Sequence, residues 1–310
     1  MTPPRLAALV LLAALPACTV SKHATQAADL GVAHPSSDLL AHLNEPGPVV
    51  LETVASCDWS VDRKGLINLK HPNARAAHIR KGPEPIQVYF HVLRHPTRGT
   101  FLIDTGVETA LRDHPKQAAL RGVVASYMKI ETTMKFLTPL GEWVAREKQP
   151  IQGVFLTHLH VDHISGMADV PAGTPVYTGP GENAARGFLH MFTRKSTGRA
   201  LAGKPPLREL QFKPDPDGRF AGVLDLFGDG SAWALWVPGH TPGSIAFLVR
   251  TPQGPVLLTG DTSHTRWGWD HDVEPGKFSA DIPTSAESLH RLRTLVREHP
   301  EIQVRLGHQP

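Results

Sequence analysis

The stretch Thr157-His158-Leu159-His160-Val161-Asp162-His163 decides how the rest of this sequence of 310 residues is interpreted. It directly follows residues 151–156, a short apolar run that predicts a buried strand. Alternate side chains of an extended segment point to one side, so the first two histidines can reach one cation. Where the chain turns, the aspartate and the third histidine can face a second position beside it. Imidazole and carboxylate ligands together suit zinc and related ions, and the stretch therefore predicts a metal site.

Three further polar residues of the same kinds follow predicted strands later in the chain. His240 lies in the turn Pro238-Gly239-His240-Thr241-Pro242-Gly243, Asp261 ends Leu257-Leu-Thr-Gly-Asp261, and His308 follows a terminal strand. Polar ligands at strand ends, with apolar strands behind them, form a rigid site on an α/β scaffold. Asp104 ends another predicted strand, where a turn role is one interpretation.

Strand and helix signals alternate along the chain and predict an α/β fold. The predicted strands cover residues 86–93, 100–103, 151–156, 175–178, 233–237, 244–249, 255–259 and 302–306. Residues 284–299 have an apolar face and predict an amphipathic helix. Residues 107–149 have helical spacing interrupted by two prolines, and residues 182–204 predict a helix or a lid.

The composition excludes some classes of function and structure. Lys and Arg number 32 and Asp and Glu 29, so 32 − 29 gives a formal charge of +3, which is too small to predict nucleic-acid binding. The hydrophobic share of 41% allows a large core. Two cysteines cannot form a disulfide framework, and Cys57 is predicted to be a small buried side chain.

The first residues predict export. One cation, Arg5, precedes an apolar run that is too short to span a bilayer and is typical of a signal peptide. Leu15-Pro16-Ala17-Cys18 resembles the lipobox of bacterial lipoproteins. We expect residues 1–17 to be a signal peptide, Cys18 to carry lipid, and residues 18–48 to form a polar tether. The alternative is ordinary cleavage near Ala17, which gives a soluble periplasmic or secreted protein.

The order HLHVDH, GHTPGS, TGD and GH resembles the metallo-β-lactamase superfamily across residues 49–308. The resemblance implies a four-layer αββα sandwich, here as a hydrolase domain over residues 49–310. It implies that His158, His160 and His240 hold one metal, that Asp162, His163 and His308 hold a second, and that Asp261 bridges both. It also implies that Asp104 lies next to these ligands, where its carboxylate can accept from a metal-bound imidazole. It also implies two divalent ions, for which we expect zinc, with iron, cobalt or manganese as alternatives.

Within that superfamily the sequence is most similar to the N-acyl homoserine lactonase group. The segments that show this similarity are residues 240–248, residues 256–263 and the helix before the terminal strand. Two ions can share a hydroxide that attacks the lactone carbonyl, and Asp162 can orient water or accept its proton. The group commonly has a tyrosine three residues after the bridging aspartate, where this chain has His264. Imidazole can also donate a hydrogen bond or a proton there, and the alternative is a spectator role.

The substrate pocket is the least determined part of the site. Trp267, Trp269, Phe188 and Phe192, with Met191, could line it, although core packing is the alternative for such residues. We expect a small-molecule substrate, no nucleic-acid partner, and membrane contact only through the lipid. Other functions left open are hydrolysis of β-lactams, carboxylic esters or organophosphates, and metal binding without catalysis. The sequence does not determine the oligomeric state.

Overall fold

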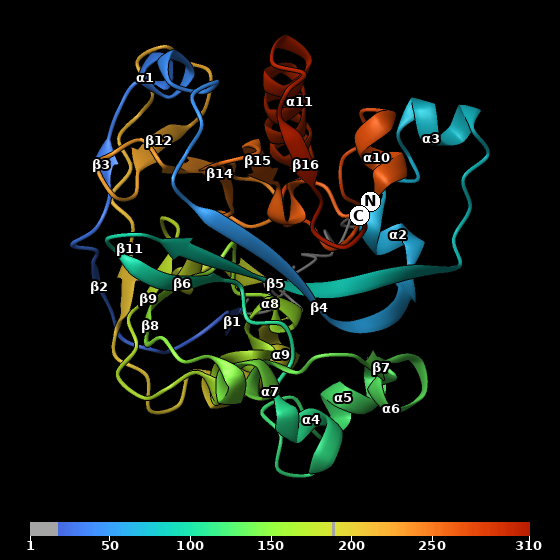
Figure 1. Ribbon diagram of the computed structural model, residues 1–310. Helices are drawn as coiled ribbons and strands as arrows, with labels where there is room; N and C mark the ends of the chain where they lie inside the picture. Colours follow the sequence, from blue (N-terminus) through green and yellow to red (C-terminus); the bar gives the residue numbers. More distant parts are fainter. Residues whose placement is uncertain (1–17, 188–189) are drawn as a thin grey trace, which may run out of the picture.

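The computed structural model describes residues 18–187 and 190–310, and its elements form the predicted four layers. Figure 1 shows them stacked from helix α11 (Ile282–Glu298) at the top, through two sheets, to helices α4 (Thr109–Asp113), α7 (Leu140–Arg146) and α9 (His190–Ala200) at the bottom. The fold is therefore the four-layer αββα sandwich that the resemblance implies.

Two large sheets form the inner layers. The first has eight strands in the order β2 (Thr25–Ala27), β11 (Leu207–Glu209), β9 (Val176–Thr178), β8 (Ile151–Phe155), β6 (Gly99–Ile103), β5 (Pro83–His95), β4 (Val50–Asp62) and β7 (Lys135–Phe136). The second has six, in the order β16 (Gln303–Arg305), β15 (Gly254–Leu258), β14 (Ile245–Thr251), β13 (Ala232–Trp236), β12 (Gly222–Asp225) and β3 (Val32–Ala33). A separate short pair joins β1 (Cys18–Thr19) to β10 (Arg186–Gly187).

Strand direction brings the predicted ligands to one edge. β6, β8 and β9 are parallel neighbours, and β15 and β16 are parallel in the other sheet. The carboxyl ends of parallel strands meet at the same sheet edge. The segments that follow β6, β8, β15 and β16 therefore gather at one side of the sandwich.

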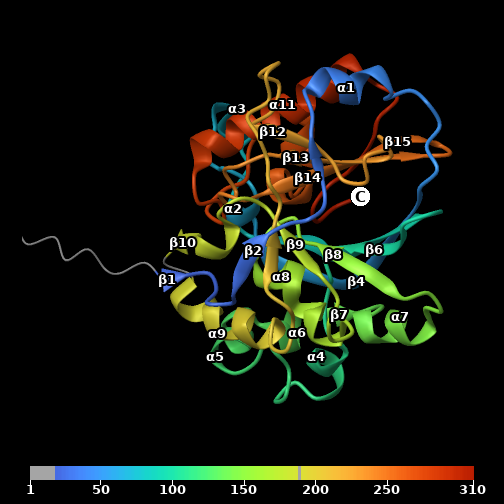
Figure 2. The same ribbon diagram turned by 90° about the vertical axis from the view of Figure 1, so that its left-hand side faces the viewer.

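Helices cover the two outer faces. The eight-stranded sheet carries α4, α7 and α9 with α5 (Val123–Tyr127), α6 (Ile130–Thr133), α8 (Val161–Ile164) and the 3-10 turns η1 (Ser165–Asp169) and η2 (Glu182–Ala184). The six-stranded sheet carries α1 (Ser36–Ala41) and α11, as Figure 2 also shows. The remaining short elements are α2 (Arg63–Leu66), α3 (Pro72–Ala76), α10 (Arg266–Asp270) and η3 (Gly260–Thr262).

The core lies mainly between the sheets. Leu93, Ile103 and Phe155 from the first sheet pack with Phe247 and Val249 from the second, and all five are buried. Separate apolar clusters fill the space under the helices on each outer face. This burial explains why the central strands read as apolar runs in the sequence.

The predicted strands are present, each within about two residues of its expected ends except β5, which begins earlier. Residues 107–149 were expected to be helical, but they form four short helices and the strand β7, which pairs with β4. Pro115 and Pro139 lie at helix boundaries, and Lys129 separates α5 from α6 with a left-handed φ of 54°. Proline and left-handed residues end helices, which explains why the periodic pattern did not give a continuous one.

Residues 18–48 also correct an expectation, because they are not a tether. β2 adds a parallel strand to β11, and β3 adds an antiparallel strand to β12. Leu39 and Leu43 are fully buried against the six-stranded sheet. Residues 18–48 are therefore part of the folded unit. Residues 1–17, where we expected a signal peptide, lie outside the described residues. No helix in the described part of the chain is long and apolar enough to cross a membrane.

Candidate metal centre

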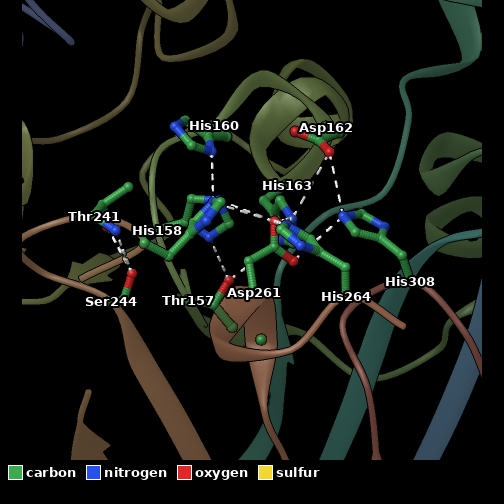
Figure 3. Close-up of polar contacts among 12 residues, drawn as sticks. Thr157, His158, His160, Asp162, His163, Thr241, Ser244, Asp261, His264 and His308 are labelled. Carbon is green, nitrogen blue, oxygen red and sulfur yellow. Dashed lines mark hydrogen bonds and ion pairs between the residues drawn. The ribbon is translucent and has the colours of Figure 1, made fainter. Parts of the chain in front are cut away.

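The seven predicted ligands converge at one edge of the two sheets (Figure 3). They form two sets that share Asp261, and within each set the ligand atoms lie within 4.8 Å of one another. The first set is His158, His160, His240 and Asp261; the second is Asp162, His163, Asp261 and His308. The sets match the two groups that the resemblance implies.

Asp261 lies at the centre of the cluster and is buried. Its Oδ2 atom is 3.3 Å from Nε2 of His163, 3.3 Å from Nε2 of His240 and 3.6 Å from Nε2 of His158. Its Oδ1 atom is 3.3 Å from Nε2 of His308. One carboxylate thus faces imidazoles of both sets, which is the geometry that a bridging ligand requires.

The protein holds the outer nitrogen of three of the ligand rings. Nδ1 of His163 donates to Oδ2 of Asp104 at 2.8 Å, and Nδ1 of His308 donates to the Gln87 carbonyl at 2.8 Å. Nδ1 of His240 lies 3.3 Å from the Ser279 hydroxyl. Such contacts fix the ring orientation and leave Nε2 as the ligand atom.

Asp104 combines a turn role with contacts to the ligand loop. Its φ of 57° places it in the left-handed region, which aspartate tolerates better than most residues. Its carboxylate accepts from the Thr157 backbone N–H at 2.8 Å and from the Thr157 hydroxyl at 2.8 Å. Because that hydroxyl donates to Asp104, it can accept from Nδ1 of His158 at 3.1 Å. Asp104 therefore orients His163 directly and His158 through Thr157.

His264 has the same arrangement as the predicted ligands. Its Nδ1 lies 3.1 Å from the Leu66 carbonyl, which can only accept, so Nδ1 carries the proton. Its Nε2 then faces Oδ2 of Asp261 at 3.0 Å. The ring is buried and stacks on His308 at 5.5 Å between centroids. His264 thus lies inside the cluster and is not a surface residue.

The electrostatics of the centre favour a bound cation. Burial disfavours the charged form of Asp261, but His264, His308 and His163 hold its pKa well below the ordinary value. Burial lowers the pKa of His158 and His240 well below the ordinary value, which keeps them neutral, as metal ligands must be.

Burial also opposes the charge on His163, but Asp261 and Asp104 raise its pKa well above the ordinary value. Within the described part of the chain, three buried atoms of the cluster lack a hydrogen-bond partner: Nε2 of His158, Nε2 of His163 and Oδ1 of Asp261. Buried polar atoms without partners are costly, and a cation among these donors would satisfy all three. The residues therefore fit a metal centre.

Glu182 is a buried residue of this region that the sequence gave no reason to select. Its Oε1 accepts from the Leu159 backbone N–H at 2.8 Å, and its Oε2 accepts from the Gly243 backbone N–H at 3.0 Å. Burial raises its pKa. It joins the loop of His158 to the turn of His240 and so holds the first ligand set together.

Close packing at Gly307 explains the glycine before His308. A Cβ atom built there would lie 2.4 Å from Oδ1 of Asp261 and 2.8 Å from the Gly260 carbonyl. Real Cβ atoms do not approach so closely. Glycine is therefore required where the C-terminal segment passes the central carboxylate.

The structure does not bring the predicted pocket residues together. Trp269 is 7% exposed and is buried in the apolar cluster with α11, because α10 packs its second tryptophan toward the six-stranded sheet. Trp267 is half-buried and stacks on His271. Phe192 and Met191 are exposed on α9, and Phe188 lies outside the described residues. Cys57 is buried as predicted, and burial raises the pKa of its thiol to about 12.

Comparisons with known proteins agree with this geometry. The model of the family described as "Metallo-beta-lactamase superfamily" matches residues 83–308. An N-acyl homoserine lactonase AttM of Azorhizobium caulinodans is 29% identical over 254 residues, which cover 80% of this chain and 91% of that protein.

Solved structures share the fold. A quorum-quenching N-acyl homoserine lactone lactonase aligns with a TM-score of 0.60 and 17% identity, over 86% of this chain and 94% of that one. AidC, a dizinc quorum-quenching lactonase in complex with a homoserine product, aligns with a TM-score of 0.57 and 14% identity, over 91% and 92% of the two chains.

Proposed function

The chain belongs to the metallo-beta-lactamase superfamily and is a metal-dependent hydrolase; from that premise, we propose that it opens the lactone ring of N-acyl homoserine lactones. The observation that carries the proposal is the convergence of seven donors and His264 on Asp261. The relative AttM, which is 29% identical and named as an N-acyl homoserine lactonase, supports the substrate class.

The donor set supports two zinc ions. His158, His160 and His240 would hold one, Asp162, His163 and His308 the other, and Asp261 would contact both. Ions held there supply Lewis acidity toward the lactone carbonyl and lower the pKa of water. Five imidazoles and two carboxylates suit zinc, and iron, cobalt or manganese could occupy the same donors.

Two side chains of the site are suited to move protons. Asp162 contacts His163 and His308 through Oδ2 alone, and its side chain is 19% exposed, so Oδ1 can orient water or accept its proton. The Leu66 carbonyl orients the His264 ring through Nδ1, so Nε2, 3.0 Å from Oδ2 of Asp261, is the atom placed to exchange a proton with the leaving alkoxide. We assign His264 the position that tyrosine commonly has in the lactonase group.

Acid production tests the proposal, because opening a lactone releases a proton. Purified zinc- or cobalt-loaded protein is given a long-chain N-acyl homoserine lactone in a pH-stat. His160→Ala should abolish turnover, whereas the control His114→Ala, at an exposed position outside the site, should not. Absence of turnover by protein that binds two metals would contradict the lactonase proposal. β-Lactams, carboxylic esters and organophosphates would then be tested on the same protein.

We also propose that the protein is exported and anchored through lipid on Cys18. The support is the apolar run and the motif Leu15-Pro16-Ala17-Cys18. Labelled palmitate should be incorporated into the wild-type chain and not into Cys18→Ala. Equal labelling of both proteins would contradict this assignment.

A further inference from the structure

One surface of the protein combines the first strand with the start of helix α9. β1 pairs antiparallel with β10, and the Val20 backbone N–H donates to the Ala185 carbonyl at 2.8 Å. α9 packs against β1, and Figure 2 shows β1, β10 and α9 together at one side of the molecule. We name this surface the β1–α9 face and define it by residues 18–22, 186–187 and 191–195.

The β1–α9 face is cationic. Residues 183–208 contain six Lys or Arg and no Asp or Glu, and residues 18–28 contain Lys22 and no acidic residue. Three of the six cations bind within the protein: Arg199 donates to the Ala119 carbonyl, Lys204 donates to the Val170 carbonyl, and Arg208 pairs with Asp29. The other three, like Lys22, lie on the β1–α9 face.

Those four cations are Lys22, Arg186, Arg194 and Lys195. In the described ranges, none of them forms a salt bridge, whereas Arg208 nearby does. Lys22, Arg186 and Lys195 are exposed and Arg194 is partly exposed. Their charge is therefore not neutralised by the protein, and it suits an anionic partner.

Large apolar side chains lie among these cations. Met191 is 38% exposed and Phe192 is 53% exposed, and both lie about one turn before the buried Ser196 and Thr197 of α9. A helix with exposed aromatic and apolar residues next to Lys and Arg is typical of segments that lie in the interface of a bilayer. A purely electrostatic partner would give no reason for the exposed apolar pair.

We propose that the β1–α9 face docks on an anionic lipid bilayer, with Met191 and Phe192 in the headgroup region and the four cations on the lipid charges. The proposal rests on the proposed lipid anchor in one respect: Cys18 begins β1, so an anchor there would bring this same face to the membrane. It does not rest on the lactone chemistry.

Docking in this orientation would bring the metal centre to the membrane. α9 packs against α8, and α8 carries Asp162 and His163. A substrate whose acyl chain partitions into the bilayer would then arrive next to the centre. The orientation therefore selects acylated, amphiphilic substrates over fully water-soluble ones.

Vesicle binding without lipid on the protein tests the proposal. Residues 18–310 contain every described element, so this chain with Cys18→Ser is mixed with vesicles of phosphatidylcholine, or of an equimolar mixture with phosphatidylglycerol. Each Lys or Arg that comes close to an anionic leaflet strengthens the binding of a protein to the membrane roughly fivefold. We expect binding to the anionic vesicles at least tenfold tighter than to the neutral ones, and weaker at high salt.

Matched variants locate the surface. Arg194→Glu with Lys195→Glu should weaken binding at least tenfold, and Met191→Ser with Phe192→Ser should weaken it several-fold. Lys70→Glu with Lys81→Glu makes the same charge change beside α3, which lies apart from β1 and α9 in both figures, and should have little effect. Val50→Ser, at a residue 55% exposed on β4, is the apolar control.

Three results would overturn the proposal. They are equal binding to the two kinds of vesicle, equal effects of the paired variants and their controls, and equally tight binding to duplex DNA that does not depend on Met191 and Phe192. None of these measurements uses catalysis. A failure of the proposed lactonase activity therefore leaves the result interpretable.

Discussion

Replacing Asp104 by asparagine should weaken metal binding without unfolding the protein. Asparagine also tolerates the left-handed backbone at this position, and its carbonyl can still accept from the Thr157 N–H. The amide group would replace Oδ2, which accepts from Nδ1 of His163 at 2.8 Å. The amide N–H and the Nδ1–H of His163 would then face each other as two donors. His163 would relieve this repulsion by moving its proton to Nε2, the atom that faces Asp261.

The magnitude follows from that single contact. A hydrogen bond to a charged group contributes about 1.5–3 kcal/mol, which corresponds to roughly 10–100-fold in an equilibrium constant, and substitutions next to metal-bound histidines typically cost 10–100-fold in metal affinity. We expect the loss of metal affinity at the set of Asp162, His163 and His308, and a smaller loss at the set that includes His158.

Competition with a chromophoric chelator measures both affinities. Asp113→Asn, an exposed aspartate on α4, is the control and should bind metal as the wild type does. Circular dichroism should show the same fold for all three proteins. If Asp104→Asn bound two ions with wild-type affinity, Asp104 would have no part in orienting His163, and its role would be limited to the turn.

Three other substitutions test different contacts. Glu182→Gln leaves one backbone N–H facing an amide group, so the free energy of unfolding should fall by about 1–3 kcal/mol in a denaturant titration, with weaker binding of the first metal. Gly307→Ala should displace Asp261 and reduce kcat about a hundredfold, and metal content per chain should fall in elemental analysis; unchanged values would refute the close approach. Burial raises the pKa of Glu108 from 4.5 to about 7, so the wild type should lose stability as pH rises from 4.5 through 7, because the folded state then has to ionise a buried acid. Glu108→Gln should therefore raise the melting temperature above pH 7 and change it little below pH 4.5.

Much of the site was accessible from the sequence because its donors follow apolar strands. The strands before His158 and Asp261 are short apolar runs, and the edge at which they end follows from parallel pairing. The order of the motifs HLHVDH, GHTPGS, TGD and GH then assigned His240 and His308 to the same metal centre. Local patterns of this kind predict the structure correctly because the strands that carry them are buried in the core and are therefore apolar along their whole length.

The remaining features depend on tertiary contacts without a local pattern. Glu182 looks like any surface acid in the sequence, and only folding places it between two loops. Residues 18–48 are polar because β2 and β3 are short edge strands, whose sequences resemble those of a linker. Trp269 follows Trp267 by two residues, and the direction in which α10 packs decides which of the two is buried.

The position of the donors along the chain gives the centre a role in assembly. Four of the seven lie within residues 158–163, so a nascent chain presents them together before the second sheet exists. The other three follow β13, β15 and β16, so they reach the first four only where the second sheet lies on the first. A chain whose sheets docked wrongly would offer only four of the seven donors together and would hold an ion weakly. Because a ligand that binds only the native state stabilises it by mass action, tight metal retention would distinguish correctly assembled molecules from compact misfolded ones.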